Sequence, residues 1–513
     1  MATPQEKLAA SLEVLHRLQS TGQRVFKTDQ LSRVHRERLQ EQGFLRSIIK
    51  GWLMSSGSSA APGDTAPWHA SLWEFCARYC TDRFGDEWHL SPELSILLHA
   101  EATTIPRQVV VYTPRGGNNT IELPFDTSLY DLMTGPLPPE EDLVWRDGLR
   151  LFTPASALVR VSEDWLHRFP VEARVALAMV PDASDVLRPL LGGGHSTVAG
   201  RLAGAFRRTG RAGVADEILE TMASAGYDVR EADPFSPDQR LKAVQAKTSP
   251  MTARIEGLWS ALRDQAIEAF PPAPGRPDDV ARYSRFVDDI YPSDAYHSLS
   301  IEGYSVTREL VERVRSGEWD PEHRRGDHDE RDALAARGYW QAFQRVKTSV
   351  TAVLGGANPG AVARDAHREW YRELFQPFVA AGVFEAAALA GYRSGPVYIR
   401  DSRHVPPRAE AVRQSMPTLF DLLEHEGDAS ARAVLGHWLV GYIHPYPDGN
   451  GRIARFLMNV MLAAGGYPWT VIRVEDRDAY LTALEAASVE SDIRPFAHFL
   501  AERVRWSSER TPG

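Results

Sequence analysis

Cysteine is scarce in this chain, and its scarcity excludes one kind of site. The 513 residues include only two cysteines, Cys76 and Cys80, which lie four positions apart in a segment with helical spacing. A structural zinc site needs four ligands, and no further pair of ligands lies nearby. We expect both cysteines to be buried free thiols in a reducing compartment, which predicts a cytoplasmic protein.

Long apolar runs and an excess of basic residues are also missing. No run approaches the roughly 20 apolar residues of a membrane span, so no membrane partner is expected. The first residues, MATPQEKLAASLEVLHRL, lack a basic region followed by an apolar core, which argues against a secretion signal. The formal net charge of −10 argues against nucleic-acid binding by the chain as a whole. The length predicts two to four domains.

Residues 444–455, HPYPDGNGRIAR, concentrate groups that suit a nucleoside triphosphate. The preceding stretch, 431–443, is apolar with helical spacing, and 452–464 resumes as a second apolar helix. The motif is therefore predicted to be a loop leading into a helix N-terminus, where free backbone N–H groups and the helix dipole favour an anion. Gly449 and Gly451 allow phosphate to approach the backbone closely.

The charged residues of the loop fit the remaining parts of such a site. Arg452 and Arg455 share one helix face and suit two phosphate groups. Asp448 is a hard oxygen ligand for Mg²⁺, and His444 can accept a proton from an attacking hydroxyl. A triphosphate held in this way can be attacked at the α-phosphorus, which transfers AMP, or at the γ-phosphorus, which transfers phosphate. The residues alone leave both open.

This segment resembles the signature of the Fic family, His-x-Phe-x-Asp/Glu-Gly-Asn-Gly-Arg-x-x-Arg, with Tyr446 in the phenylalanine position as an apolar anchor whose hydroxyl needs a partner. The resemblance extends over about 250–505. It implies a protein adenylyltransferase that moves AMP from ATP, with Mg²⁺ as cofactor, to a Ser, Thr or Tyr hydroxyl of a target protein or of itself. The family's phosphate-transferring, Doc-like branch carries Ala and Lys where this chain has Gly449 and Gly451, which favours AMP transfer. The family roles fall on a general base, His444, a magnesium ligand, Asp448, and nucleotide-binding residues, Gly449, Asn450, Gly451, Arg452, Arg455 and Asn459.

A second motif lies upstream of the first. Residues 298–303, SLSIEG, match the family's inhibitory pattern Ser/Thr-x-x-x-Glu-Gly/Asn, which predicts an inhibitory helix near 290–303. A carboxylate against Arg455 would form a bidentate pair and remove the partner of the γ-phosphate. Alone, the pattern favours a helix end with a solvated glutamate and a glycine cap, and the loop motif downstream turns the interpretation towards inhibition. The expected inhibitory residues are Ser298, Glu302 and Gly303, and some family members with this glutamate also remove AMP.

The segment between the two motifs predicts a β-hairpin flap. Residues 396–399 alternate like a strand, and 400–403 form a polar turn. An exposed hairpin edge can bind an extended target by main-chain pairing, and an ordinary surface hairpin is the alternative. The expected docking residues are Val397, Tyr398 and Ile399.

The N-terminal half differs in charge and predicted structure. Residues 7–50 contain nine basic and four acidic residues. Residues 1–55 resemble a winged helix-turn-helix, in which Thr28 caps a short helix and Arg33, Arg36 and Arg38 lie at or near the recognition helix. Residues 68–240 predict an α+β domain, with strands at 108–112 and 120–123 joined by the turn 115–119. Together they resemble the N-terminal half of abortive-infection antitoxin-type regulators.

The sequence thus predicts a multidomain, mainly α protein. An all-helical Fic domain with a β-hairpin flap follows a winged helix and an α+β domain. The first functional hypothesis is an autoinhibited AMP-transferase, and the second is a DNA-binding, antitoxin-like regulator whose Fic domain senses nucleotide. A homodimer contact and a ligand of the N-terminal region are both candidate means of relieving inhibition.

Overall fold

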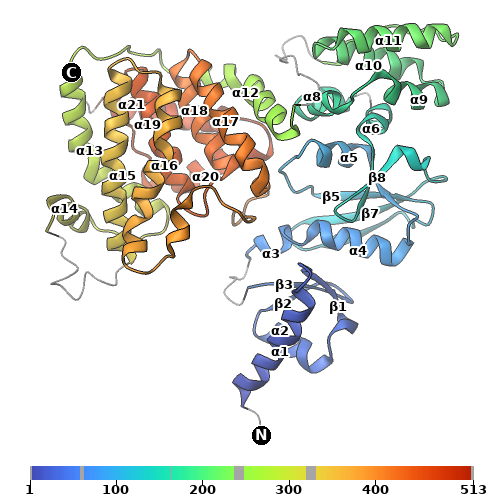
Figure 1. Ribbon diagram of the computed structural model, residues 1–513, viewed down its shortest axis with the longest axis horizontal. Helices are drawn as coiled ribbons and strands as arrows, with labels where there is room; N and C mark the ends of the chain where they lie inside the picture. The colour runs from blue at the N-terminus through green and yellow to red at the C-terminus, as the bar shows by residue number, and fades with distance from the viewer. Residues whose placement is uncertain (1–2, 58–62, 163, 236–247, 319–330, 510–513) are drawn as a thin grey trace. The chain divides into compact units, whose positions relative to one another are not determined.

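Among the described residues, strands lie in the first part of the chain, and helices make up most of the remainder (Figure 1). Figure 1 shows the computed structural model, which describes residues 3–57, 63–162, 164–235, 248–318 and 331–509. Its backbone contacts divide into two units. The first comprises Met1–Arg254 with Tyr398–Val405, and the second comprises Ile255–Val397 with Pro406–Gly513. The prediction of a multidomain, mainly α protein is confirmed.

The first unit begins with a small sheet covered by helices. Its elements are α1 (Pro4–Gln19), β1 (Val25–Lys27), η1 (Thr28–Gln30), α2 (Arg33–Glu41), β2 (Leu45–Ile49) and β3 (Trp52–Ser55). The sheet order is β1-β3-β2, and both pairings are antiparallel. The helix expected to start at Thr28 is split: η1 is a short 3₁₀ turn, Leu31 is extended and buried, and Ser32 caps α2 by accepting from the His35 N–H. An extended residue cannot continue a helix, so α2 needs its own cap.

A second sheet follows, with order β4-β5-β7-β6. Its strands are β4 (His89–Leu90), β5 (Gln108–Thr113), β6 (Asn119–Leu123) and β7 (Thr127–Met133). The two strands predicted from the sequence are β5 and β6, but they do not pair with each other. Strand β7 lies between them, parallel to β5 and antiparallel to β6. The buried Asp131 of β7 explains this: its carboxylate accepts from the N–H groups of Gly117 and Asn119 and fixes the connecting turn across β7.

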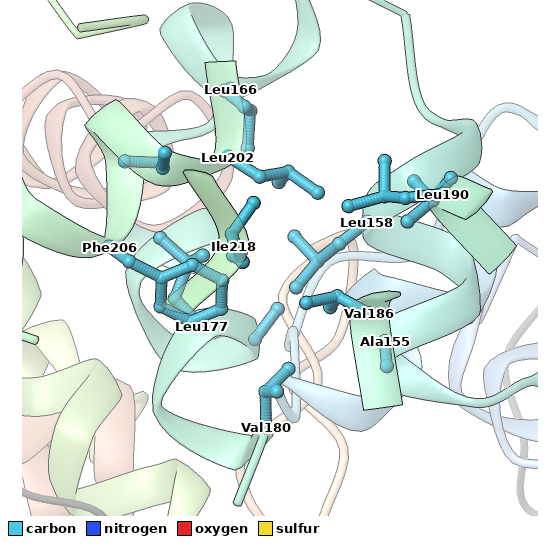
Figure 2. Close-up of a cluster of buried hydrophobic side chains, with 14 of the residues drawn as sticks. Ala155, Leu158, Leu166, Leu177, Val180, Val186, Leu190, Leu202, Phe206 and Ile218 are labelled. Atoms are coloured by element: carbon cyan, nitrogen blue, oxygen red, sulfur yellow. The ribbon is translucent and has the colours of Figure 1, made fainter. Parts of the chain in front are cut away.

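Helices complete the first unit. They are α3 (Ala66–His69), α4 (Leu72–Phe84), α5 (Pro92–His99), α6 (Pro154–Arg160), α7 (Trp165–Arg168), α8 (Pro170–Met179), α9 (Ala183–Gly193), α10 (Ser196–Arg208) and α11 (Ala212–Ser224), with η2 (Glu140–Asp142) and the hairpin β8 (Leu143–Arg146) and β9 (Leu149–Phe152) before α6. Leu158, Leu177, Leu202, Phe206 and Ile218 point into one apolar core (Figure 2). Both cysteines are buried in α4 and unpaired, as expected. Residues 236–240, the end of the predicted α+β domain, lie outside the described residues.

The segment predicted as a β-hairpin flap is not a hairpin. Residues 396–399 form no strand, and the following arm pairs with residues 103–105 of the first unit instead. The N–H of Ile105 donates to the Arg403 carbonyl at 2.9 Å, and the N–H of Val405 donates to the Thr103 carbonyl at 2.6 Å. The Arg403 guanidinium returns to the Ile105 carbonyl at 2.7 Å. The hairpin prediction is wrong because the backbone partner of this arm lies far away in the chain.

The second unit is a bundle of helices around a buried pair. Its elements are α12 (Pro250–Glu268), α13 (Val280–Ile301), α14 (Arg308–Ser316), α15 (Arg331–Leu354), α16 (Pro359–Ala380), η3 (Ala386–Ala390), α17 (Ala409–His425), α18 (Ala429–Ile443), α19 (Asn450–Ala464), η4 (Val474–Asp476), α20 (Arg477–Val489) and α21 (Arg494–Ser508). Almost every residue of α18 and α19 is buried, because α15, α16, α17, α20 and α21 cover the pair. Helix α18 is apolar nearly all round, whereas α19 also buries Arg452 and Arg455. Among the described residues, no helix is long and apolar enough to cross a membrane.

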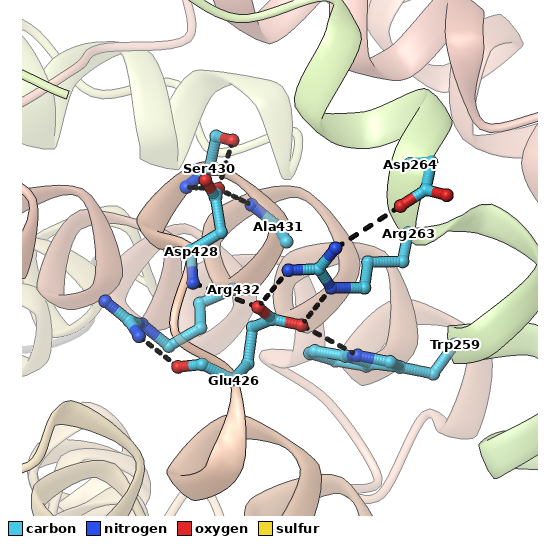
Figure 3. A network of polar contacts seen from close by, with 8 residues as sticks. All are labelled: Trp259, Arg263, Asp264, Glu426, Asp428, Ser430, Ala431 and Arg432. Carbon is cyan, nitrogen blue, oxygen red and sulfur yellow. Dashed lines mark hydrogen bonds and ion pairs between the residues drawn. The ribbon is translucent and has the colours of Figure 1, made fainter. Parts of the chain in front are cut away.

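The start of α18 is fixed by a polar network (Figure 3). The buried Glu426 carboxylate accepts from Nε and Nη2 of Arg263 at 2.7 and 2.8 Å, and from the Trp259 indole at 3.4 Å. Asp428 accepts from two free N–H groups in the first turn of α18, and Arg432 donates to the Glu426 carbonyl. A bidentate arginine pair and a capped N-terminus hold α12 against α18. Helix α18 is therefore held in place at its N-terminus, and its C-terminus leads into the loop at His444.

Candidate active site

The loop between α18 and α19 has the shape that the sequence predicts. His444 is the C-cap of α18 and lies in the left-handed region with φ 51°, and Gly449 is the N-cap of α19 with φ 80°. The Asn450 side chain closes the loop: its Oδ1 accepts from the Tyr446 N–H at 2.9 Å, and its Nδ2 donates to the Tyr446 carbonyl at 2.8 Å. Since that amide is engaged, an anion at the helix start would meet the backbone N–H of Asn450 rather than its side chain.

Arg393 also holds this loop, although it belongs to an earlier segment of the chain. The sequence alone did not identify it. This arginine is only 3% exposed. Its Nε donates to the His444 carbonyl at 2.8 Å, its backbone N–H donates to the Pro445 carbonyl at 2.9 Å, and its guanidinium also donates to the Gly395 and Pro407 carbonyls. A lone arginine in the stretch Gly-Tyr-Arg-Ser-Gly has no periodic or spacing signal, so only the fold identifies it.

His444 has one ring nitrogen that is able to accept a proton. Its Nδ1 lies 3.3 Å from the Gly441 carbonyl, and because a carbonyl only accepts, Nδ1 carries the proton. The other ring nitrogen, Nε2, is then the one that can take a proton. Burial lowers the pKa of His444 below its ordinary value, although the Gly441 carbonyl opposes that shift. The imidazole is therefore neutral at neutral pH.

The glycine cradle at the start of α19 already contacts a carboxylate. A side chain on Gly451 would collide with Oε1 of Glu302 and lie 3.1 Å from Nη1 of Arg455. Burial opposes the ionisation of Glu302, but the guanidiniums of Arg455 and Arg452 outweigh it and hold the pKa of Glu302 below its ordinary value. The cradle is thus a place where a negative charge is stabilised.

The upstream motif supplies this carboxylate. Glu302 is the C-cap of α13, and its Oε1 accepts from Nη2 of Arg455 at 2.6 Å. Ser298 completes the contact: its hydroxyl accepts from Nε at 2.8 Å, and its carbonyl accepts from Nη2 at 3.1 Å. The carboxylate contact passes through one nitrogen, so the bidentate pair expected from the sequence is wrong in detail. Gly303, with φ 85°, follows the helix in the left-handed region, where glycine is favoured.

Asp448 is the only acidic residue of the loop. Its side chain is 50% exposed, and its Oδ1 lies 3.5 Å from Nη2 of Arg452. Among the described residues, no group of three or more His, Cys, Asp or Glu side chains is placed to hold a metal ion. One accessible carboxylate does not make a protein cage for a cation, but it fits Mg²⁺ that is also held by phosphate oxygens and water.

Asn459 lies one turn beyond Arg455 on α19 and is fully engaged within the protein. Its Oδ1 accepts from the Thr470 N–H at 2.8 Å, and its Nδ2 donates to the carbonyls of Thr470 and Arg455. The side chain therefore fixes Thr470 against α19. Its expected contact with a nucleoside remains a prediction.

Tyr446 packs as an anchor, but its hydroxyl differs from expectation. The ring is fully buried and stacks on Tyr371, with centroids 4.0 Å apart and planes at 9°. The sequence predicts that the hydroxyl needs a partner, yet within the described part of the chain it has no hydrogen bond. A buried hydroxyl without a partner costs about 1–3 kcal/mol.

Tyr446→Phe is therefore expected to raise the free energy of unfolding by about 1 kcal/mol, since it removes the unpaired hydroxyl and keeps the ring. Urea unfolding measures the change. Tyr371→Phe is the matched control, because the Tyr371 hydroxyl donates to the Ala388 carbonyl at 2.9 Å, and its loss should destabilise the protein. A loss of stability in Tyr446→Phe would contradict the prediction.

The basic residues of α2 are only partly available. Arg33 is 81% exposed in its side chain and pairs with Glu37 at 2.6 Å. Arg36 donates to the Thr28 carbonyl, and Arg38 donates to the Lys7 carbonyl and the Ser11 hydroxyl. Two of the three arginines expected to face DNA thus also hold the small domain together.

Comparison with known proteins matches the region that contains this site. A model described as the Fic/DOC family matches residues 362–462. Protein adenylyltransferase Fic of Nematostella vectensis is 31% identical over 225 residues, which are 42% of this chain and 48% of that protein. Protein adenylyltransferase Fic of Drosophila willistoni is 38% identical over 115 residues, which are 22% of this chain and 22% of that protein. The chain thus spans less than half the length of these relatives.

Solved structures give weaker matches. Fic-1 from Caenorhabditis elegans is 17% identical, with a TM-score of 0.37, and the match covers 64% of this chain and 91% of that one. A Fic domain containing signaling protein from Bacteroides thetaiotaomicron is 22% identical, with a TM-score of 0.35, and the match covers 50% of this chain and 95% of that one.

Proposed function

Because this chain carries a Fic domain, we propose that it is a protein adenylyltransferase that moves AMP from ATP to a hydroxyl side chain of a protein. The target hydroxyl attacks the α-phosphorus, a new P–O bond forms, and pyrophosphate leaves. His444 takes the hydroxyl proton on Nε2. The backbone N–H groups at the start of α19, with Arg452 and Arg455, stabilise the charge on the phosphates.

One observation carries this proposal: the cradle at Gly451 and Arg455 already holds a carboxylate in the resting protein. An anion position bounded by a helix start and a buried arginine suits a phosphate group as well as a carboxylate. Asp448 would hold Mg²⁺ beside it, and the ion would supply further charge neutralisation to the triphosphate.

The same observation supports autoinhibition. While Glu302 occupies Arg455, a terminal phosphate has to displace a charged partner, so ATP binds in the productive pose only at a cost. Ser298 and Gly303 set the position of the glutamate, the first by its contact with Arg455 and the second by turning the chain away after α13. The carboxylate lies close enough to the cradle to orient a water, so removal of AMP is a second activity of the same proposal.

Transfer of label from ATP tests the reaction type. The protein and its Glu302→Gly variant are incubated with Mg²⁺ and ATP labelled at either the α- or the γ-phosphate. Label from the α-position is expected in protein, with greater incorporation in the variant, and label from the γ-position is expected in pyrophosphate. Incorporation of γ-label alone would mean phosphate transfer, and incorporation of neither label by the variant would refute the transferase proposal.

Binding of DNA by residues 1–55 is the second candidate function. The order α1-β1-η1-α2-β2-β3 and the antiparallel sheet favour it, since a winged helix has this arrangement. The test is binding to duplex DNA at low salt. Arg33→Glu should weaken salt-sensitive binding, whereas Arg494→Glu, on the exposed surface of α21, should not. No binding by the unaltered protein would exclude this function.

A further inference from the structure

Arg452 is buried in a way that a guanidinium seldom tolerates. Its side chain is fully buried, and none of its three nitrogens has a hydrogen-bond partner among the described residues. The nearest opposite charge is the Asp448 carboxylate, 3.5 Å away. A guanidinium carries five N–H donors, and leaving them unpaired and out of water is costly. This arrangement needs a compensating contact in the resting protein, and an anion that reached the nitrogens would relieve it.

Two aromatic rings cover this guanidinium. The ring centroid of Phe375 lies 5.0 Å from its central carbon, and that of Tyr304 lies 5.4 Å away. Both distances lie within cation–π range, so the rings replace part of the lost hydration. Beside these rings, the guanidinium nitrogens are buried away from solvent.

The two rings differ in how they are held. Phe375 belongs to α16, is buried in the helical core and packs against Gly449, where a side chain would lie 2.8 Å from its ring. Tyr304 lies outside any helix, directly after Gly303 and before α14. Its ring also lies 5.3 Å from the guanidinium of Arg331. Of the two aromatic residues, only Tyr304 lies on a segment that connects two helices. It follows Glu302 by two residues.

We propose that Tyr304 is a second restraint on the site, which withholds Arg452 while Glu302 withholds Arg455. The proposal rests on the proposed function. One short segment, residues 302–304, then controls both arginines of the loop: a carboxylate occupies one, and an aromatic ring shields the other. Tyr304 is a positioning residue, because it acts on ATP through Arg452. Displacing the segment uncovers both guanidiniums together.

The test is the affinity for ATP in the presence of Mg²⁺, measured by calorimetry on the full chain. Tyr304→Ala should tighten binding roughly 3- to 30-fold, the value of a cation–π contact at a partly desolvated site. Tyr304→Phe keeps the ring and should bind ATP as the unaltered protein does. Tyr304→Leu keeps apolar volume without an aromatic face, so it should resemble Tyr304→Ala even if the alanine variant is unstable. Combined with Glu302→Gly, Tyr304→Ala should tighten binding beyond Glu302→Gly alone.

Three results would overturn the proposal. If Tyr304→Ala and Tyr304→Leu leave ATP affinity unchanged or weaken it, while Glu302→Gly strengthens it, Tyr304 does not restrain the site and the proposed function stands. If Glu302→Gly itself binds no ATP, the proposed function fails and this inference fails with it. Tighter binding in the phenylalanine variant would also contradict a role for the ring, because its aromatic face is retained.

Discussion

Glu302→Gly is expected to increase AMP incorporation roughly 10- to 100-fold. The variant removes the charged hydrogen bond to Arg455, which is worth about 1.5–3 kcal/mol, and each 1.4 kcal/mol corresponds to a tenfold change. Freed from its carboxylate, Arg455 can bind the terminal phosphate. Glycine at this position should cost the fold little, because Glu302 is the C-cap of α13 and its backbone already leaves the helix there.

Initial rates of α-label incorporation measure the effect. Glu302→Gln, which keeps the size but loses the charge, should give a smaller increase. Glu309→Ala, at an exposed position in the first turn of α14, is the control for a glutamate outside the contact. If Glu302→Gly has the rate of the unaltered protein and binds ATP no more tightly, the inhibitory role of Glu302 is refuted.

His444→Ala in the Glu302→Gly background is expected to lower the rate roughly 10²- to 10⁴-fold, the usual contribution of a positioned general base. ATP affinity should change little, because the proposed phosphate cradle lies at the start of α19, whereas His444 caps the end of α18. The result to measure is therefore a loss of turnover with binding retained. His498→Ala, a histidine exposed on α21, is the matched control and should keep its rate.

A normal rate in His444→Ala would rule out His444 as the base. Loss of ATP binding together with turnover would instead assign this histidine to the nucleotide site. Calorimetry beside the rate measurement separates the two outcomes.

The pH dependence of Glu302→Gly should report the same histidine. The proposed base is the neutral imidazole of His444, and burial lowers its pKa, so the active form should persist at lower pH than for a free histidine. The rate should hold at about pH 6.5, the ordinary histidine value, and fall only at more acid pH. A fall in rate that begins at or above pH 6.5 would contradict this assignment. His444→Ala is the control, and its residual rate should lack the fall at acid pH.

The centre of the site was predictable because its residues are adjacent in the sequence. Proline and glycine interrupt two apolar helices within residues 444–455, so the loop, the helix start and the shared face of Arg452 and Arg455 all follow from local rules. The upstream glutamate was predictable only through a motif. Its contact with Arg455 depends on how α13 packs, and no periodicity contains that information.

The supports of the site were not predictable, since they come from distant segments. Arg393, Phe375 and Tyr304 reach the loop from three different parts of the chain. The count of basic residues in 7–50 likewise assumes that every arginine side chain is free at the surface. Arg36 and Arg38 show the limit of that assumption, because their guanidiniums bond to backbone carbonyls of the small domain.

The strands illustrate the same limit for the fold. The sequence patterns at 396–399 and at 120–123 favour extended segments but do not identify the strands with which they pair. Strand β6 follows a turn that resembles a hairpin turn, yet Asp131 directs it to the far side of β7. A strand needs a backbone partner, and the local sequence does not specify which distant segment will supply it.

The pairing of residues 103–105 with Arg403 and Val405 has a consequence for biosynthesis. A ribosome makes the chain from its N-terminus, and domains generally fold as they emerge. The first unit includes Tyr398–Val405, so it cannot be complete when Arg254 has been made. It closes only after more than half of the second unit has left the ribosome. Until then the hydrogen bonds that the Ile105 N–H and the Thr103 carbonyl make with this segment cannot form, and a chain cut short before Tyr398 would lack them.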